Sequence, residues 1–162
     1  MRNMLVFKLS LCFLSLFFST ASFALDNLSE AQLKQKGLEF VAAKNARQRL
    51  DSGVEDIDHY LSLLSESFID EYVHYKVTFS ADKTKLRARL IEKMKQQTLE
   101  NQVQIQQMIV GPNVVVLKLR EKGKIKPTGQ SQSLDIDRLS VISLEFDKQG
   151  RISHIRRHGE TL

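Results

Sequence analysis

The sequence predicts an α+β domain in which helices pack against a curved, mostly antiparallel sheet. Helical periodicity is concentrated in residues 30–97, before most of the strand-like segments. The second half reads as consecutive alternating strands, and short turns at 111–113 and 147–150 join them as hairpins. Consecutive hairpins build an antiparallel sheet, and segregated helices must cover one of its faces.

Residues 1–24 are predicted to be a secretory signal peptide. Arg2 and Lys8 give a positive start, and an apolar run follows over 9–18. Ser22 and Ala24 supply the small residues of a cleavage site, so we expect cleavage after Ala24. The apolar run is shorter than the roughly 20 residues of a membrane span. The mature chain, residues 25–162, is therefore expected to be one exported domain, periplasmic or secreted, without stable membrane insertion.

Export also restricts the chemistry and the partners. The single cysteine, Cys12, leaves with the signal, so the mature chain is expected to have no disulfide and no thiol chemistry. Leu11 precedes Cys12 where a lipid-attachment motif needs a small residue. The formal net charge of +5 would otherwise suggest a nucleic acid. An exported protein is not expected to meet one, so no nucleic-acid partner is predicted.

Three helices are expected. A capping box from Ser29 to Gln32 starts the first, predicted over 30–50. Its core face carries Leu33, Gly37, Phe40, Val41 and Lys44. The second is predicted over 54–67, with Ile57 and Leu61 inward. The third follows Asp82 to about 97, and its basic residues are expected to form a solvated face, contact with anionic lipid being the lesser alternative. These basic residues are Lys83, Lys85, Arg87, Arg89, Lys93 and Lys95.

The remaining segments read as strands and one loop. Alternation predicts one long strand over 68–79, then strands over 101–110 and 114–120. The polar segment 121–133 is predicted to be a long exposed loop. The strongest strand signal is the closing hairpin, 137–158, whose turn ends in Gly150 because glycine tolerates a positive φ.

Four segments carry a resemblance to a known family: E-F-V-A-A-K-N-A (39–46), Y-L-S-L-L-S-E-S-F (60–68), V-Q-I-Q-Q-M-I-V-G-P-N-V-V-V (103–116) and I-S-L-E-F-D-K-Q-G-R-I-S-H-I (142–155). The chain resembles the SnoaL-like branch of the nuclear transport factor 2-like superfamily. That resemblance implies a cone in which a curved sheet wraps a long helix and leaves a pocket at its open end. Members include isomerases, dehydratases, cyclases and many proteins without a known activity.

The resemblance also tests one chemistry. Ketosteroid isomerases of this fold use a tyrosine and a protonated aspartate to hold an oxyanion, and a second aspartate as base. The matching segments place Phe40 at the tyrosine position and Ile142 at the oxyanion aspartate. Tyr72 falls near the position of the base. Phe40 and Ile142 cannot donate a hydrogen bond, so that mechanism is not expected here.

Strand parity selects the residues that could line a pocket. Arg138 and Ser140 share parity with the apolar set of their strand, and the resemblance adds Arg157 from the last strand. In segment 68–79 the resemblance turns Asp70, Tyr72 and His74 inward. Hydrophobicity alone selects Val73, Tyr75 and Val77 instead, and a slip of one residue exchanges the two sets. Tyr60 either closes the base of the pocket or packs in the core.

Three hypotheses of function follow. The first is an exported domain that binds a small polar or anionic molecule through Tyr60, Arg138, Ser140 and Arg157, with arginine as a carboxylate clamp. The second is an acid/base enzyme, an isomerase, dehydratase or cyclase-like protein, using His74, Tyr72 and Asp70. For both sets, ordinary rim or surface residues are the competing interpretation. The third is a homodimer joined through the sheet face that carries Val114, Val116, Leu139 and Val141.

No metal site and no cofactor are expected. His154 and His158 share one strand face, but Arg156 lies between them and would repel a cation. Two histidines also fall short of the three protein ligands of a catalytic zinc. The sequence contains no glycine-rich phosphate loop and no nucleophile elbow.

Overall fold

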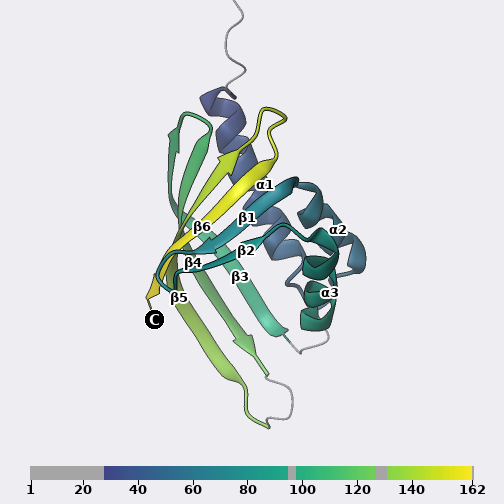
Figure 1. Cartoon of the computed structure of the whole chain (residues 1–162). Helices are drawn as coiled ribbons and strands as arrows, with labels where there is room; N and C mark the ends of the chain where they lie inside the picture. Colours follow the sequence, from purple (N-terminus) through teal and green to yellow (C-terminus); the bar gives the residue numbers. More distant parts are fainter. Residues whose placement is uncertain (1–27, 95–97, 127–130, 162) are drawn as a thin grey trace, which may run out of the picture.

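Helices cover one face of a six-stranded sheet in the computed structural model, which describes residues 28–94, 98–126 and 131–161 (Figure 1). The predicted α+β class with a mostly antiparallel sheet is confirmed. The predicted signal peptide lies outside the described residues. Within the part of the chain that is described, no helix is long and apolar enough to cross a membrane.

The helices begin at the predicted capping residues, and the first two end earlier than predicted; the predicted end of the third, near residue 97, lies outside the described residues. Helix α1, Glu30–Ala46, starts at a capping box in which the Ser29 side chain accepts a hydrogen bond from the Gln32 amide at 3.2 Å. Helix α2, Val54–Ser62, ends before the predicted residue 67 because Leu64 already pairs with Ile152 in the sheet. Helix α3 spans Lys83–Met94.

The strands form one sheet in the order β2-β1-β6-β5-β4-β3. Their bounds are β1 Leu64–Tyr72, β2 Val77–Ser80, β3 Thr98–Gly111, β4 Val114–Ile125, β5 Leu134–Phe146 and β6 Ile152–Thr161. Every neighbouring pair is antiparallel except β1 and β6, which run parallel. The first and last strands of the predicted sheet thus meet side by side, which brings Asp70 and Arg157 together.

The predicted single strand 68–79 is wrong. The chain turns over at 73–76, where Lys76 has a φ of 53°, and returns as β2. Asp70 and Tyr72 precede the turn and follow the predicted inward parity, whereas His74 lies in the turn and is exposed. The predicted inward position of His74 is therefore wrong, because strand alternation stops before it is reached.

The predicted exposed loop 121–133 is also wrong at its start. Strand β4 continues to Ile125, and its alternation carries Glu121 to the same inner face as Leu117 and Leu119. Glu121 is only 3% exposed. The polar composition of this segment therefore suggested a loop where the chain forms a strand. The inward acid of that strand, Glu121, has partners inside the protein.

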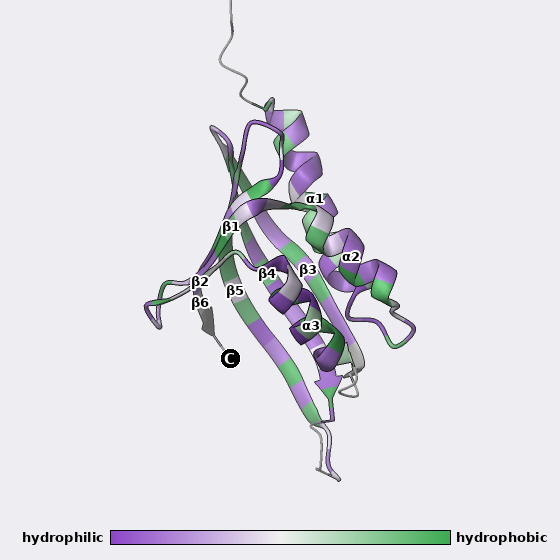
Figure 2. Cartoon of the chain, turned by 45° about the vertical axis from the view of Figure 1, so that its right-hand side comes forward, coloured by the Kyte–Doolittle hydropathy of each residue, from purple (hydrophilic) through white to green (hydrophobic). Residues whose placement is uncertain are grey.

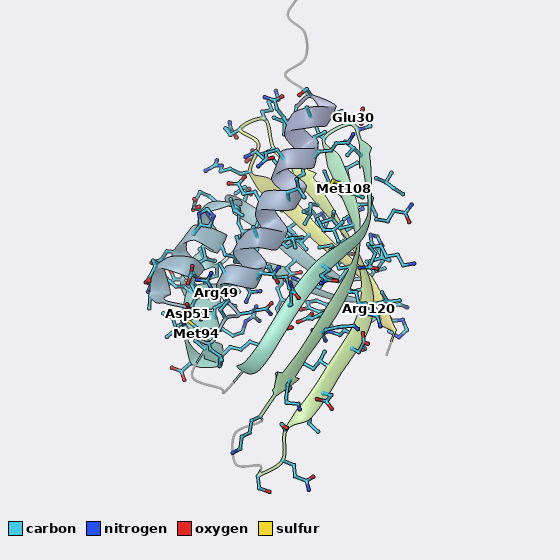
Figure 3. All side chains as sticks on the ribbon, turned by 180° about the vertical axis from the view of Figure 1, so that it is seen from behind. Glu30, Arg49, Asp51, Met94, Met108 and Arg120 are labelled. Atoms are coloured by element: carbon cyan, nitrogen blue, oxygen red, sulfur yellow. The ribbon has the colours of Figure 1, made fainter. Side chains whose placement is uncertain are left out.

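The core fills the space between α1 and the inner sheet face. Figure 2 shows hydrophobic and hydrophilic residues alternating along β3, β4 and β5, as a sheet with one covered face requires. Helix α1 packs tightly on the sheet at Gly37, where an added Cβ would lie 3.0 Å from the Met108 methyl carbon. Figure 3 shows Met108 beside the first half of α1. The predicted glycine in the closing hairpin is confirmed, since Gly150 has a φ of 72°.

Candidate functional site

A cavity of about 380 Å³ lies between the helices and the inner face of the sheet. That volume suits a small organic molecule. The residues that line it come from both sides. The charged and polar ones are Lys44, Arg47, Gln48, Tyr60, Asp70, Tyr72, Arg89, Lys93, Arg138, Ser140 and Arg157. The apolar ones include Leu64, Phe68, Leu86, Leu90, Leu119, Ile142 and Ile155.

Most of the predicted site residues come together here. Those that line the cavity are Tyr60, Asp70, Tyr72, Arg138, Ser140 and Arg157. His74 does not line it; its ring packs edge-on against Tyr75, with the centroids 5.1 Å apart. The cavity therefore holds the two predicted arginines but lacks the predicted histidine base.

Asp70 and Arg157 form a buried ion pair on the sheet side. The two carboxylate oxygens accept hydrogen bonds from Nε and Nη2 of Arg157 at 2.8 and 3.1 Å. Burial opposes the charge on Arg157, but attraction to Asp70 dominates and raises the pKa of the guanidinium above its usual range. Tyr72 covers this pair, with its ring centre 5.1 Å from the guanidinium carbon. Asp70 is therefore engaged in holding Arg157.

Glu121 is the centre of a second buried group. Its carboxylate accepts hydrogen bonds from Asn101 at 2.7 Å, from Arg138 at 2.9 Å and from Lys44 at 3.3 Å. Burial by itself would raise the pKa of Glu121, but the charges of Lys44 and Arg138 and the Asn101 hydrogen bond lower it to about 2. Glu121 is thus ionised at neutral pH and neutralises cations on two elements.

Lys44 projects from the last turn of α1 into this group. Its side chain is 12% exposed. Burial lowers the pKa of Lys44 to about 8; Glu121 opposes this shift, and Arg157 and Arg47 add to it. A share of this amine is therefore neutral near physiological pH.

Three cations on the helix side differ from those on the sheet side. Arg47 follows α1, and Arg89 and Lys93 lie on α3; none of them forms an ion pair with an acid in residues 28–94, 98–126 or 131–161. We call these three residues the helix-side cations. Arg47 and Arg89 each lie over an aromatic ring, Tyr60 and Phe79, at 4.5 and 5.4 Å.

Two of the helix-side cations, Lys93 and Arg47, repel each other, and polar atoms beside them lack hydrogen-bond partners among the described residues. Burial lowers the pKa of Lys93, and the nearby Arg47, Arg138 and Arg157 lower it further, while Glu121 partly offsets them. The Arg47 Nε and the neighbouring Gln48 Oε1 are buried without a hydrogen-bond partner in the described structure. A buried donor without a partner costs about 1–3 kcal/mol, so a ligand that supplied an acceptor would recover that energy.

Known proteins resemble this chain in structure and not in sequence. No protein-family model and no curated protein matches it. A candidate SnoaL-like polyketide cyclase from Shewanella putrefaciens superposes with a TM-score of 0.62 at 15% identity, covering 78% of this chain and 79% of the other. The chain has the SnoaL-like, nuclear transport factor 2-like cone fold.

Two further structural neighbours show how widely proteins of this fold differ. A LEH-like epoxide hydrolase from M. tuberculosis has a TM-score of 0.57 at 16% identity, covering 78% of this chain and 81% of the other. A candidate ketosteroid isomerase from Kribbella flavida has a TM-score of 0.52 at 12% identity, covering 78% and 76%. At these identities the likeness establishes the fold alone. Ile142 lines the cavity as a hydrocarbon, and buried Phe40 carries no hydroxyl.

Sequence reasoning missed four of the charged residues at this site. Lys44 lay on the core face of the first helix, and that position was a usable signal. Arg89 and Lys93 are exposed, as the predicted solvated face requires, but they also line the cavity, while Lys83 and Arg87 of the same helix pair with Glu66 and Asp58. Arg47 and Gln48 follow the end of α1 and carried no pattern of their own.

The outer sheet face holds the two histidines of the closing hairpin and the predicted dimer patch. His154 pairs with Glu71 at 3.0 Å, and His158 with Ser143 at 2.9 Å. No group of three or more metal-ligating side chains occurs among the described residues. The predicted dimer patch lies on this face as well: Leu139 and Val141 are just over a third exposed, and Val114 and Val116 are partly buried.

Proposed function

We propose that the cavity binds a small organic anion, a carboxylate carried on an apolar body. The observation that carries this proposal is the set of helix-side cations, Arg47, Arg89 and Lys93, which face the cavity without acids of their own. Glu121 offsets only part of the repulsion between Arg47 and Lys93, so this gathered positive charge raises the free energy of the empty protein. An anionic ligand would remove that repulsion.

The other wall of the cavity defines the rest of the ligand. Phe68, Leu119, Ile142 and Ile155 present hydrocarbon to the cavity, and burying an apolar body against them contributes roughly 25 cal/mol per Å². An arginine fork binds a carboxylate through two parallel hydrogen bonds, which also fixes its orientation. A flat aromatic or short aliphatic carboxylate fits both requirements.

The alternative acid/base enzyme has less support. His74 is exposed outside the cavity, and Asp70 is held by both of its oxygens in the pair with Arg157. Tyr72 covers that pair. A general base must reach the proton that it removes, and neither His74 nor the engaged Asp70 is placed to do so. Binding is the function that the arrangement favours.

We also propose that the protein acts after export, as the signal-like segment 1–24 suggests, and that it pairs through the outer sheet face. Amino-terminal sequencing of the protein from a periplasmic extract would test the first point, with Leu25 as the expected first residue. Sedimentation of wild type and a Val141→Glu variant would test the second. A wild-type monomer would contradict the pairing.

Isothermal titration tests the binding proposal directly. We expect 2-naphthoate to bind the mature protein and 2-naphthamide, which has the same shape without the charge, to bind at least about tenfold more weakly. The Arg47→Gln and Lys93→Gln variants should each lose about tenfold in affinity for the anion. Arg49→Gln is the matched control, because Arg49 lies outside the cavity and pairs with Asp51.

Two results would contradict the proposal. Equal binding of the acid and the amide would show that charge has no part in recognition. Equal losses in Arg47→Gln and Arg49→Gln would show that the protein responds only to general positive charge.

A further inference from the structure

We propose that Lys44 is an amine nucleophile that condenses with the carbonyl carbon of a 2-oxo acid bound in the cavity. This inference rests on the proposed anion site for holding the carboxylate and adds a covalent reaction to it. The atom concerned is the Lys44 Nζ, which neither the predicted site residues nor the proposed binding role requires.

Position is the first support. Lys44 lines the cavity, and Arg47 stands three residues further along the chain, so their side chains share one face about 5–6 Å apart at the Cβ atoms. In a 2-oxo acid the carboxylate and the keto carbon are directly bonded. A carboxylate held by Arg47 and Lys93 would thus place the keto carbon within reach of the Lys44 amine.

The sharing of Glu121 is the second support. Loss of the Lys44 proton would normally strand a buried carboxylate, which is expensive. Here Glu121 keeps hydrogen bonds from Arg138 at 2.9 and 3.2 Å and from Asn101 at 2.7 Å, and the Lys44 contact, at 3.3 Å, is the longest. When Lys44 is neutral, Glu121 therefore keeps its ion pair with Arg138 and its hydrogen bond from Asn101.

The charges around Lys44 favour its neutral form. One acid, Glu121 on β4, favours the ammonium form, whereas Arg157 on β6 and Arg47 at the end of α1 oppose it. Arg138 and Lys93 line the same cavity, and Asp70 is engaged by Arg157. Desolvation beside other cations is a known means of activating a lysine amine. A pKa lowered from 10.5 to about 8 increases the neutral fraction at pH 7 by more than about 100-fold.

The reaction balances without an oxidant or a reductant. The Nζ lone pair forms a bond to the keto carbon, and the carbonyl oxygen takes a proton to give a carbinolamine. Loss of that hydroxyl with the second amine proton gives one water and a C=N bond. The anionic carboxylate stays with the helix-side cations throughout.

Reductive trapping tests the proposal. Mature protein is incubated with pyruvate and sodium cyanoborohydride, and the adducts are mapped by peptide mass spectrometry. We expect Lys44 to be modified about tenfold or more faster than exposed lysines such as Lys34 and Lys122 in the same sample. The yield at Lys44 should rise with pH through about 8.

Variants separate this reaction from general labelling. The Lys44→Arg variant keeps the positive charge but should lose the fast-reacting site. The Lys34→Arg variant should keep the fast reaction at Lys44. Glu121→Gln removes the charge that favours the ammonium, so Lys44 should label faster at pH 7. The labelling pattern of the wild-type protein decides the question by itself, so the test does not depend on whether a variant folds. Labelling spread over surface lysines, or an unmodified Lys44, would overturn it.

Acetone distinguishes the two proposals. If naphthoate binds and pyruvate leaves Lys44 unmodified, the nucleophile proposal fails and the anion site stands. If Lys44 reacts equally fast with pyruvate and with acetone, which has no carboxylate, and naphthoate does not bind, the anion site fails and with it the 2-oxo acid as substrate, and only the nucleophilic amine stands.

Discussion

Both sides of the cavity carry positively charged side chains, but among the described residues only those on the sheet side form ion pairs with acids. On the sheet side, Arg157 is held by Asp70, and Arg138 shares Glu121 with Lys44. The helix-side cations form no ion pair in the part of the chain that the structure describes: Arg47 and Arg89 lie over aromatic rings, and Glu121 only partly offsets the repulsion between Lys93 and Arg47. Paired cations stabilise the fold, since each pair satisfies two buried groups. Unpaired cations raise the free energy of the empty protein, which is the arrangement expected where a ligand brings the missing charge.

The largest expected effect comes from breaking the sheet side. Asp70→Ala leaves Arg157 buried without its acid, and we expect a loss of about 3–5 kcal/mol in the free energy of unfolding, measured in urea. Asp58→Ala removes the acid of the exposed Asp58–Arg87 pair and should change little. Adding Arg157→Met to Asp70→Ala should recover stability. Equal losses in Asp70→Ala and Asp58→Ala would show that the buried pair is not structural.

The next effect is a dependence of stability on pH that is due to Glu121. Its pKa of about 2 in the folded protein lies below its unfolded value of about 4.3, so its stabilisation is complete above that unfolded value. As pH falls towards 2 we expect about 3 kcal/mol of unfolding free energy to be lost. Urea unfolding between pH 6 and pH 2.5 measures this. The decrease in unfolding free energy between pH 6 and pH 2.5 should be smaller in the Glu121→Gln variant. An unchanged decrease would assign the acid sensitivity to other groups.

A smaller and opposite effect is expected on the helix side. Lys93→Gln removes repulsion with Arg47, so the free energy of unfolding should stay level or rise by less than about 1 kcal/mol, because partial exposure screens the charge. Affinity for 2-naphthoate should still fall about tenfold. A destabilised Lys93→Gln protein would mean that Lys93 supports the fold and would remove the contrast between the two sides.

The smallest effect is expected from a residue that lines the cavity without charge. Ser140→Ala should change the unfolding free energy by less than about 0.5 kcal/mol and leave the affinity for 2-naphthoate nearly unchanged. Both are measured beside Lys93→Gln under the same conditions. A large loss of affinity in Ser140→Ala would place a hydrogen bond to the ligand on the sheet side.

Parity explains what the sequence could predict of this site. Arg138 and Ser140 lie on a strand with clear alternation, so their direction followed from their apolar neighbours, while the direction of Arg157 followed from the family resemblance. His74 was misplaced because the turn at 73–76 contains no glycine or proline, and its positive φ falls on Lys76. A turn built from ordinary residues carries little local signal.

Charge on a helix was harder to interpret. A basic face looks the same in sequence whether it meets water or a cavity, so Lys93 and Arg87 could not be separated until the distance from α3 to the sheet was known. Glu121 was missed for a related reason: the polar composition of segment 121–133, with its two glycines and one proline, suggested a loop. Only the pairing of β4 with β5 shows that Glu121 lies inside. The hairpin pattern was sufficient for the fold, while the buried charges depend on tertiary contacts.

The most direct test measures urea unfolding of wild type and of the Arg47→Gln/Lys93→Gln variant, each with and without 2-naphthoate. With ligand at about 100 times its dissociation constant, wild type should gain about 2.7 kcal/mol. The variant should be as stable as wild type without ligand and should gain almost nothing with it. A variant that is strongly destabilised alone, yet still stabilised by 2-naphthoate, would contradict a ligand-binding role for the helix-side cations.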